Sequence, residues 1–228
     1  MNLPEDTAGI LLVDKAQGYT SFSLVSLLRK MTNIAKIGHS GTLDPFATGL
    51  MVMLIGRQAT TQADRWIACD KQYRATFFLG ATTDSYDLDG KILSTSPIVP
   101  TREAVEAAIA HFEGGYRQMP PMFSAKRIAG RKLYQMARQG ITVERALVPV
   151  KLTWTLLSYN YPYLEVEVDC SKGTYIRSLA YDLGQLLGCG AYVQELQRLR
   201  SGPFELKDSI PQAQLAPGVD ITPYLKRI

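Results

Sequence analysis

The stretch YLEVEVDC at residues 163–170 places the strongest limit on how this chain can fold. Apolar and acidic residues alternate along it without a break: Leu164, Val166, Val168 and Cys170 against Glu165, Glu167 and Asp169. A period of two residues is typical of a strand with one buried face and one wet face, as antiparallel sheets allow. We therefore expect a half-buried antiparallel strand here.

Other stretches have the helical period or are short and apolar. A helix expected from Thr101 to residue 113 has one apolar face, made of Val105, Ala108, Ile109 and Phe112. A helix capped by Thr20 or Ser21 is expected to bury Phe22, Val25 and Leu28, with Leu24 beside them. A third helix follows residue 175, and apolar runs at 9–14, 50–56, 71–80 and 191–202 predict strands. Because the elements do not alternate regularly as βαβ units, the sequence predicts an α+β fold with a mixed sheet.

Composition narrows the class of protein. The net charge of +4 suggests a polyanionic partner, although many unrelated proteins carry a similar charge. Three cysteines and no CxxC pair predict neither a disulfide framework nor a zinc cluster, which favours a reducing cytoplasm. No apolar run approaches the roughly 20 residues of a membrane span, and the acidic N-terminus does not resemble a secretory signal.

Basic residues gather in two places. Residues 115–147 are rich in Pro, Met, Lys and Arg and read as an inserted loop with a short helix near 131–139. Four of its basic residues, Arg127, Arg131, Lys132 and Arg138, cluster with Phe123 and Tyr134. A later group comprises Lys172, Arg177, Arg198 and Arg200. Such clusters suit phosphate contacts and base stacking, or else form an ordinary solvated face.

The stretch GHSGTLDPFATGL at 38–50 carries the candidate chemistry. Asp44 before Pro45 can be an ordinary turn residue. Three glycines allow close approach of a ligand, however, and His39 lies five residues upstream, so a reactive carboxylate is the alternative. Neither the two histidines nor the acidic run at 84–89, which lacks the remaining spacing of a calcium loop, predicts a metal site.

Four ordered stretches together resemble the bacterial tRNA pseudouridine(55) synthase family, the TruB family. They are GHSGTLDPFATGL, KQYRATFFLGATTDSYDLDG, QMPPMFSAKRIAGRKLYQMARQG and CSKGTYIRSLAYDLGQLLGCGAYVQELQRLRSGPF. The resemblance implies a pseudouridine synthase fold: a mixed, largely antiparallel sheet flanked by helices, with a central active-site cleft. It also implies an isomerase that converts uridine 55 in the T-arm loop of tRNA to pseudouridine after the nucleotide is flipped out, without metal or cofactor.

The resemblance also assigns roles to residues. Asp44 matches the catalytic aspartate, Tyr73 a tyrosine that stacks on the target uracil, and Arg177 the basic partner of the catalytic carboxylate. His39 matches a histidine that touches the RNA near the target base. Lys172, Arg198 and the basic residues of the 115–147 loop (Arg127, Arg131, Lys132 and Arg138) are expected to bind RNA.

Three departures from the family pattern stand out. Ala16 replaces the proline of the usual DKPxGxTS motif, and Gln197 stands where arginine is common. We also expect the C-terminal PUA-like domain to be absent or vestigial, which leaves a single catalytic domain over residues 1–228 that acts as a monomer without an obligate protein partner. Two other functions stay open: an RNA-binding or tRNA-folding module independent of Asp44, and a metal-dependent nuclease using Asp84, Asp87 and Asp89.

Overall fold

The computed structural model describes residues 3–4, 7–124, 126–128 and 130–228, and the side chains of Arg127 and Lys132 lie outside that description. The chain divides into two compact units. Unit 1 comprises Met1–Arg74 and Leu196–Ile228, and unit 2 comprises Ala75–Glu195. Strands β4 (Lys71–Leu79) and β13 (Ala191–Ser201) contribute residues to both units. The single domain expected over 1–228 stays a prediction.

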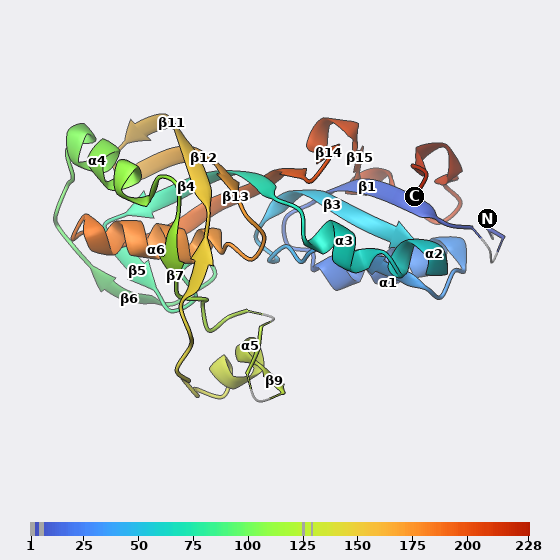
Figure 1. Ribbon diagram of the computed structural model, residues 1–228, viewed down its shortest axis with the longest axis horizontal. Helices are drawn as coiled ribbons and strands as arrows, with labels where there is room; N and C mark the ends of the chain where they lie inside the picture. Colours follow the sequence, from blue (N-terminus) through green and yellow to red (C-terminus); the bar gives the residue numbers. More distant parts are fainter. Residues whose placement is uncertain (1–2, 5–6, 125, 129) are drawn as a thin grey trace. The chain divides into compact units, whose positions relative to one another are not determined.

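Unit 1 is built around the antiparallel pair β1–β3 (Figure 1). Its strands run in the order β13-β3-β1-β15, with β2 and β14 at the sides, and the β13–β3 and β1–β15 pairs are parallel. Besides its parts of β4 and β13, unit 1 contains β1 (Gly9–Lys15), α1 (Ser21–Thr32), β2 (Ile37–His39), β3 (Thr48–Ile55), α2 (Gly56–Thr60), α3 (Ala63–Ile67), β14 (Phe204–Glu205) and β15 (Ile210–Pro211). It also contains three 3-10 turns, at Leu206–Asp208, Gln212–Gln214 and Thr222–Tyr224.

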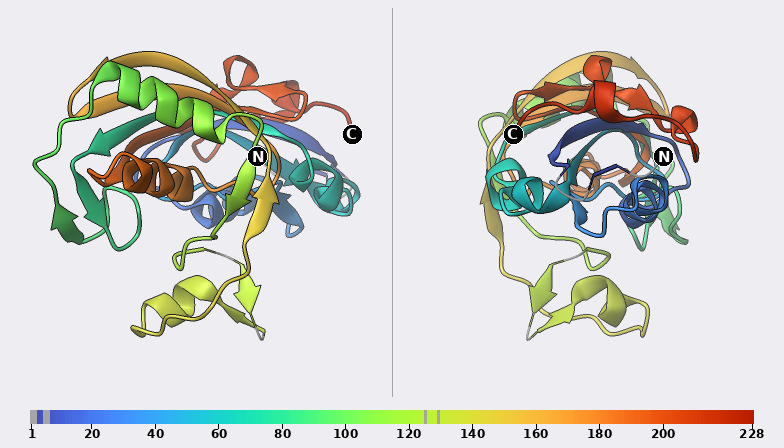
Figure 2. Two further views of the ribbon diagram at one scale, coloured as in Figure 1. Left: turned by 60° about the vertical axis from the view of Figure 1, so that its left-hand side comes forward. Right: turned by 90° about the vertical axis from the view of Figure 1, so that its right-hand side faces the viewer.

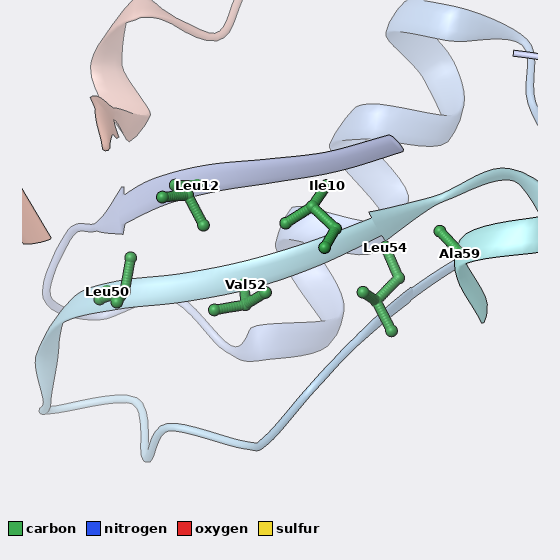
Figure 3. Packing of buried hydrophobic residues seen from close by; sticks show 6 residues of the cluster. All are labelled: Ile10, Leu12, Leu50, Val52, Leu54 and Ala59. Carbon is green, nitrogen blue, oxygen red and sulfur yellow. The ribbon is translucent and has the colours of Figure 1, made fainter. Parts of the chain in front are cut away.

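One cluster of the unit 1 core lies on one face of β1 and β3 (Figure 3). In register, Ile10 pairs with Leu54 and Leu12 with Val52, so alternate residues of both strands meet on that face. Trp66 and Phe204 pack against this cluster, with ring centroids 5.1 Å apart. Each fully buried aliphatic side chain of this kind contributes about 1.5–3 kcal/mol. The core therefore fixes β3, the strand that follows the loop carrying Asp44.

Unit 2 contains the strand order β11-β12-β4-β13. Its elements are β5 (Ala81–Thr83), β6 (Ile92–Thr95), α4 (Arg102–Phe112), β7 (Tyr116–Gln118), β8 (Arg127–Ile128), β9 (Arg131–Lys132), α5 (Leu133–Ala137), β10 (Val148–Val150), β11 (Leu152–Asn160), β12 (Tyr163–Cys170) and α6 (Ile176–Leu186). Strand β12 pairs antiparallel with β11, and its apolar residues are buried. The alternating stretch and the α+β class with a mixed sheet are confirmed.

The inserted segment leaves and returns through two paired strands. Strands β7 and β10 are antiparallel, with Gln118 opposite Val148, and we call this pair the neck. Both views in Figure 2 show α5 and the β8–β9 pair at the far end of the neck. The short helix expected near 131–139 is confirmed as α5, and Gly140 follows it with φ 73°. The segment is thus a small folded projection of unit 2.

Helix α1 differs from its prediction at one residue. Leu24, Val25 and Leu28 are buried as expected, but Phe22 is 65% exposed. The buried stripe begins at Ser21, one position earlier, because the hydroxyl of Ser21 makes hydrogen bonds inside the protein. The placement of Phe22 in the core is wrong. Among the described helices, none is long and apolar enough to cross a membrane.

Candidate active site

Asp44 lies on the loop between β2 and β3, and Ser21, the first residue of α1, holds the residue before Asp44. The hydroxyl of Ser21 donates to the carbonyl of Leu43 at 3.1 Å and accepts from the Leu43 amide at 2.9 Å. Ser21 is 3% exposed, so neither bond competes with water. The residue before Asp44 is therefore fixed by both of its backbone polar groups.

The residue after Asp44 is fixed as well. The carbonyl of Pro45 accepts a hydrogen bond from the Gly18 amide at 2.8 Å and from the ammonium of Lys15 at 3.3 Å. Lys15 is fully buried, and its ammonium also donates to the carbonyls of Ala16 and Tyr19. Asp44 itself is half-buried. Hydrogen bonds therefore fix the residues on both sides of Asp44, while Asp44 itself stays partly exposed to solvent.

Sequence reasoning missed Lys15, although a signal was present. Lysine is almost never fully buried without partners, and here it ends a strand whose residues 10–13 are aliphatic. Burial lowers its pKa from 10.5 to about 8, while the nearby carboxylate of Asp44 raises the pKa and the guanidinium of Arg198 lowers it. Lys15 is thus a buried cation close enough to Asp44 for the two charges to interact.

Arg198 reaches the same loop from β13. It is 2% exposed, and its guanidinium donates to the carbonyls of Leu50 at 2.7 Å and Gly41 at 3.3 Å, on opposite sides of Asp44. The buried guanidinium links backbone on both sides of Asp44, and the RNA contact expected of Arg198 stays a prediction. Gly49 allows this approach: with φ 98°, a Cβ there would lie 2.5 Å from the Arg198 carbonyl oxygen.

His39 ends β2 and is half-buried. Burial and then the charge of Arg198 lower its pKa, which favours the neutral imidazole. Its Nδ1 accepts a hydrogen bond from the Gly41 amide at 3.3 Å. A neutral imidazole with Nδ1 used as an acceptor carries its proton on Nε2. His39 can therefore donate a hydrogen bond from Nε2 to a ligand.

Tyr73 lies on β4 and is half-buried. The start of this strand is tied down by Lys71, whose buried ammonium donates to the carbonyls of Ile67 at 2.7 Å and Cys69. A pocket of about 590 Å³ lies beside Gln72 and Arg200. Successive side chains of a strand point to opposite faces, so this pocket lies on the other face of β4 from Tyr73.

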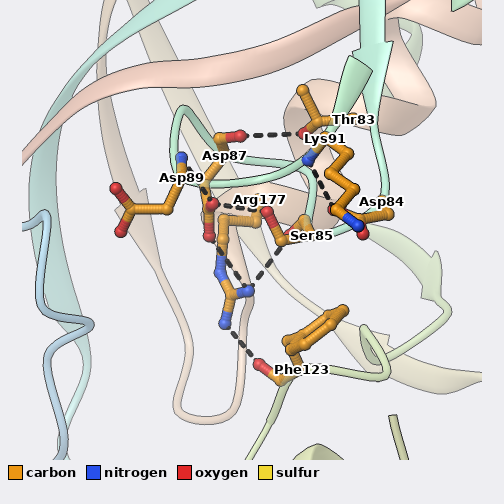
Figure 4. A network of polar contacts seen from close by, with 8 residues as sticks. All are labelled: Thr83, Asp84, Ser85, Asp87, Asp89, Lys91, Phe123 and Arg177. Carbon is orange, nitrogen blue, oxygen red and sulfur yellow. Dashed lines mark hydrogen bonds and ion pairs between the residues drawn. The ribbon is translucent and has the colours of Figure 1, made fainter. Parts of the chain in front are cut away.

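Arg177 forms the centre of a second cluster, in unit 2 (Figure 4). It is 4% exposed, and its Nη1 lies 3.3 Å from Oδ2 of Asp87. The guanidinium also donates to the carbonyls of Ser85 at 3.1 Å and Phe123 at 2.7 Å. The other carboxylate oxygen of Asp87 accepts from the Ser85 hydroxyl at 2.5 Å. Asp87 is thus a buried, fully engaged carboxylate partner of Arg177.

Sequence reasoning treated Asp87 only as a metal-ligand candidate. The resemblance instead pairs Arg177 with the catalytic carboxylate, Asp44. Asp44 lies in unit 1 and Arg177 in unit 2, and the ion pair between them stays a prediction. Among the described residues, no group of three or more His, Cys, Asp or Glu could hold a metal ion.

The other predicted RNA-binding residues are on the surface where they are described. Lys172, Arg131 and Arg138 are exposed. Arg131 donates to the side chain of Gln139 at 2.8 Å, and Arg138 lies 5.6 Å from the ring centroid of Tyr134. The predictions for the side chains of Arg127 and Lys132 fall outside the described part of the chain. The exposed cations are therefore placed where a polyanion can reach them.

Two family models match adjoining stretches of the chain. A family model for the N-terminal domain of TruB family pseudouridylate synthases matches residues 29–176, which include Asp44, Tyr73 and Lys172. The chain belongs to the TruB family. A model for the C-terminal domain of tRNA pseudouridylate synthase B matches residues 177–220, beginning at Arg177. The expected family and its isomerase class are confirmed.

Two curated relatives illustrate the likeness. The chain is 55% identical over 219 residues to tRNA pseudouridine synthase B of Chlamydia felis, covering 96% of this chain and 93% of that protein. It is also 55% identical over 212 residues to the protein of that name from Protochlamydia amoebophila, covering 93% and 81%. The likeness therefore extends over nearly the whole sequence of both units.

Solved structures support the fold. The chain matches a chain in the crystal structure of a Cbf5–Nop10–Gar1 complex with a TM-score of 0.71 and 29% identity, covering 91% of this chain and 53% of that one. A structure of an H/ACA RNP bound to a substrate RNA containing 2′-deoxyuridine gives a TM-score of 0.68 and 27% identity, covering 91% and 52%. The chain spans about half the length of both, and the pseudouridine synthase fold is confirmed.

Proposed function

We propose that this protein isomerises uridine 55 in the T-arm loop of tRNA to pseudouridine, with Asp44 as the catalytic carboxylate. The observation that carries the proposal is the construction of the Asp44 loop. Ser21 binds Leu43, Lys15 and Gly18 bind Pro45, and Asp44 between them stays half-buried. A carboxylate held this way is oriented before the substrate arrives, which is a large part of what an active site contributes.

The reaction suits a single carboxylate. The N1–C1′ bond of uridine breaks, the base turns, C5 joins C1′, and the hydrogen at C5 leaves as a proton while N1 gains one. Atoms and electrons balance without an oxidant or added group. Asp44 can attack the sugar or base, stabilise a cationic sugar, or move the proton, and the proposal covers all three.

The surrounding residues have separate tasks in the proposal. Extruding a nucleotide costs a few kcal/mol, and stacking on an aromatic side chain such as Tyr73 returns about 1–3 kcal/mol. Arg177 acts as the cation that keeps the carboxylate ionised. His39 donates a hydrogen bond near the target base, and exposed Lys172, Arg131 and Arg138 contact phosphates. We propose that the protein acts in the cytoplasm and as a monomer.

The experiment uses tRNA labelled with tritium at C5 of uracil. Wild-type protein is expected to release tritium from tRNA and not from the same tRNA with cytidine at position 55. Release from both would overturn the choice of nucleotide, and release from neither would overturn the enzyme activity.

An RNA-folding module is the second candidate, favoured by the exposed Arg131 and Arg138 of the inserted segment. It predicts that tRNA refolding persists when Asp44 is replaced by Asn. Loss of refolding in that variant would argue against it, and both functions can reside in one protein.

A further inference from the structure

Gln118 stands at the point where the inserted segment leaves unit 2. It is the last residue of β7, opposite Val148 of β10, so the chain beyond it passes from the neck into the segment. It is 1% exposed. A buried carboxamide must find partners for its polar atoms, and those partners show what the residue holds.

The partners are the two backbone polar groups of Tyr175. The Tyr175 amide donates to Oε1 of Gln118 at 2.8 Å, and Nε2 of Gln118 donates to the Tyr175 carbonyl at 3.1 Å. An acceptor and a donor facing one residue fix the orientation of the carboxamide, because the flipped amide would oppose both groups. Gln118 therefore pairs with Tyr175 as a neighbouring strand would.

A chain of hydrogen bonds supports this carboxamide from behind. Nε2 of Gln118 also donates to the hydroxyl of Tyr116 at 2.7 Å, and that hydroxyl donates to Oδ2 of Asp182 at 2.8 Å. Burial raises the pKa of both Tyr116 and Asp182. Tyr175 and Asp182 are seven residues apart, which places them on one face of α6, two turns from each other. Hydrogen bonds thus join the neck to α6 at two positions along the helix, Tyr175 and Asp182.

Two more hydrogen bonds join residues 119–123, where the segment begins, to the first turn of α6. The Ser178 hydroxyl donates to the Met119 carbonyl at 2.7 Å, and Arg177 donates to the Phe123 carbonyl at 2.7 Å (Figure 4). Helix α6 has no side-chain cap at Tyr175. Its first turn, which carries Arg177, is instead held by residues 118–123 of the segment root.

We propose that Gln118 is a positioning residue that couples RNA binding by the inserted segment to the placement of the Arg177 guanidinium. The inference rests on the proposed function for its RNA substrate. A displacement of the segment moves the neck, and the hydrogen bonds of Gln118 transmit that displacement to Tyr175. Arg177 lies two residues after Tyr175 and moves with it. Arg177 also holds Asp87 and Ser85, so the position of this turn sets the whole cluster.

The first test compares Gln118→Leu with Gln185→Leu. The two variants make the same chemical change, but Gln185 is exposed on α6. In Gln118→Leu the single-turnover rate at saturating tRNA is expected to fall about 10-fold, since small displacements of a catalytic group carry large rate penalties. Its Kd for a T-arm stem-loop should change less than about 3-fold, because the RNA-binding residues remain. An unchanged rate in a folded Gln118→Leu protein would overturn the inference.

The second test does not depend on catalysis. Hydrogen exchange of a peptide covering 171–183 is followed in the full chain with and without the stem-loop. Binding is expected to increase protection in wild type and Gln185→Leu, and not in Gln118→Leu. Equal protection in all three would contradict the coupling. If this protection pattern is observed but wild-type protein releases no tritium from tRNA, the proposed function is refuted and the coupling is still supported.

A smaller variant covers the case in which Gln118→Leu does not fold. Ser178→Ala removes only the hydroxyl that binds Met119. The rate is expected to fall about 3-fold, as loss of one neutral hydrogen bond would give. A rate and a protection change equal to wild type would then overturn the proposal.

Discussion

The Asp44 loop and the far end of the inserted segment are held in different ways. The loop is closed by buried charges and a buried hydroxyl from Lys15, Arg198 and Ser21. The segment carries Arg131 and Arg138 on its surface, with contacts to their own neighbours. A reacting carboxylate requires a fixed place, whereas phosphate contacts can be made by side chains that adjust.

The largest effect is expected when the Arg177 cluster loses its carboxylate. Asp87→Asn leaves a buried guanidinium facing a neutral amide, so we expect the single-turnover rate to fall about 100-fold, the largest fall for any variant that keeps Asp44. Asp89→Asn is the matched control, since Asp89 is exposed on the same loop. Equal rates for the two variants would remove Asp87 from the account.

Lys15→Met should lower the rate about 10-fold, because the loop loses a donor to Pro45 and the carboxylate loses a nearby charge. Lys30→Met, on the exposed end of α1, should leave the rate unchanged. Rapid-quench assays at saturating tRNA make the comparison. A Lys15→Met protein as fast as wild type would show that the buried ammonium serves folding alone.

The pKa of Lys15 gives a signed pH prediction. It is about 8 in the folded protein against 10.5 for an ordinary lysine, so between these values the unfolded chain binds more protons. The contribution of Lys15 to the free energy of unfolding therefore rises with pH in this window, while the charge near Asp44 is lost. Relative to Lys15→Met, wild type should lose activity and gain stability from pH 8 upward, measured by rate and urea unfolding. Parallel changes in the two proteins would contradict the assignment.

Ser21→Ala should act mainly on stability. It leaves the buried amide and carbonyl of Leu43 without their partner, which costs about 1–3 kcal/mol in the free energy of unfolding. Ser26→Ala, on the same helix, is the control. Urea denaturation measures both, and equal midpoints would mean that Leu43 is not held through Ser21.

The smallest effects belong to the segment surface. Arg131→Ala and Arg138→Ala should each weaken stem-loop binding about 3-fold and lower the salt dependence of Kd by roughly one counterion, with the saturated rate unchanged. Arg102→Ala, exposed on α4, should alter neither. A loss of rate at saturation would mean that these arginines do more than bind.

The sequence predicted local periodicity well and long-range polar contacts poorly. The alternation at 163–170 and the face of α4 were read correctly because neighbours in sequence decide them. Phe22 was misplaced because a buried serine, not an apolar residue, begins the inner stripe of α1. The burial of Ser21 depends on its hydrogen bond to Leu43, which lies 22 residues away in the sequence.

The candidate site follows the same rule. Asp44 and Arg177 could be named from motifs, but their surroundings could not. The contacts of Lys15 with Pro45, of Arg198 with Leu50 and of Arg177 with Phe123 join residues 30, 148 and 54 positions apart. No local pattern encodes such separations, and the roles of Tyr73, His39 and Lys172 stay predictions.

The most direct test is the rate of pseudouridine formation by Asp44→Asn under single-turnover conditions, with stem-loop binding measured in parallel. Because Asn keeps the shape of the side chain and removes its charge, the account predicts a fall of more than about 10³-fold in rate. It predicts a change of less than about 3-fold in Kd, since the phosphate contacts remain. An Asp44→Asn protein that forms pseudouridine at the wild-type rate would contradict it.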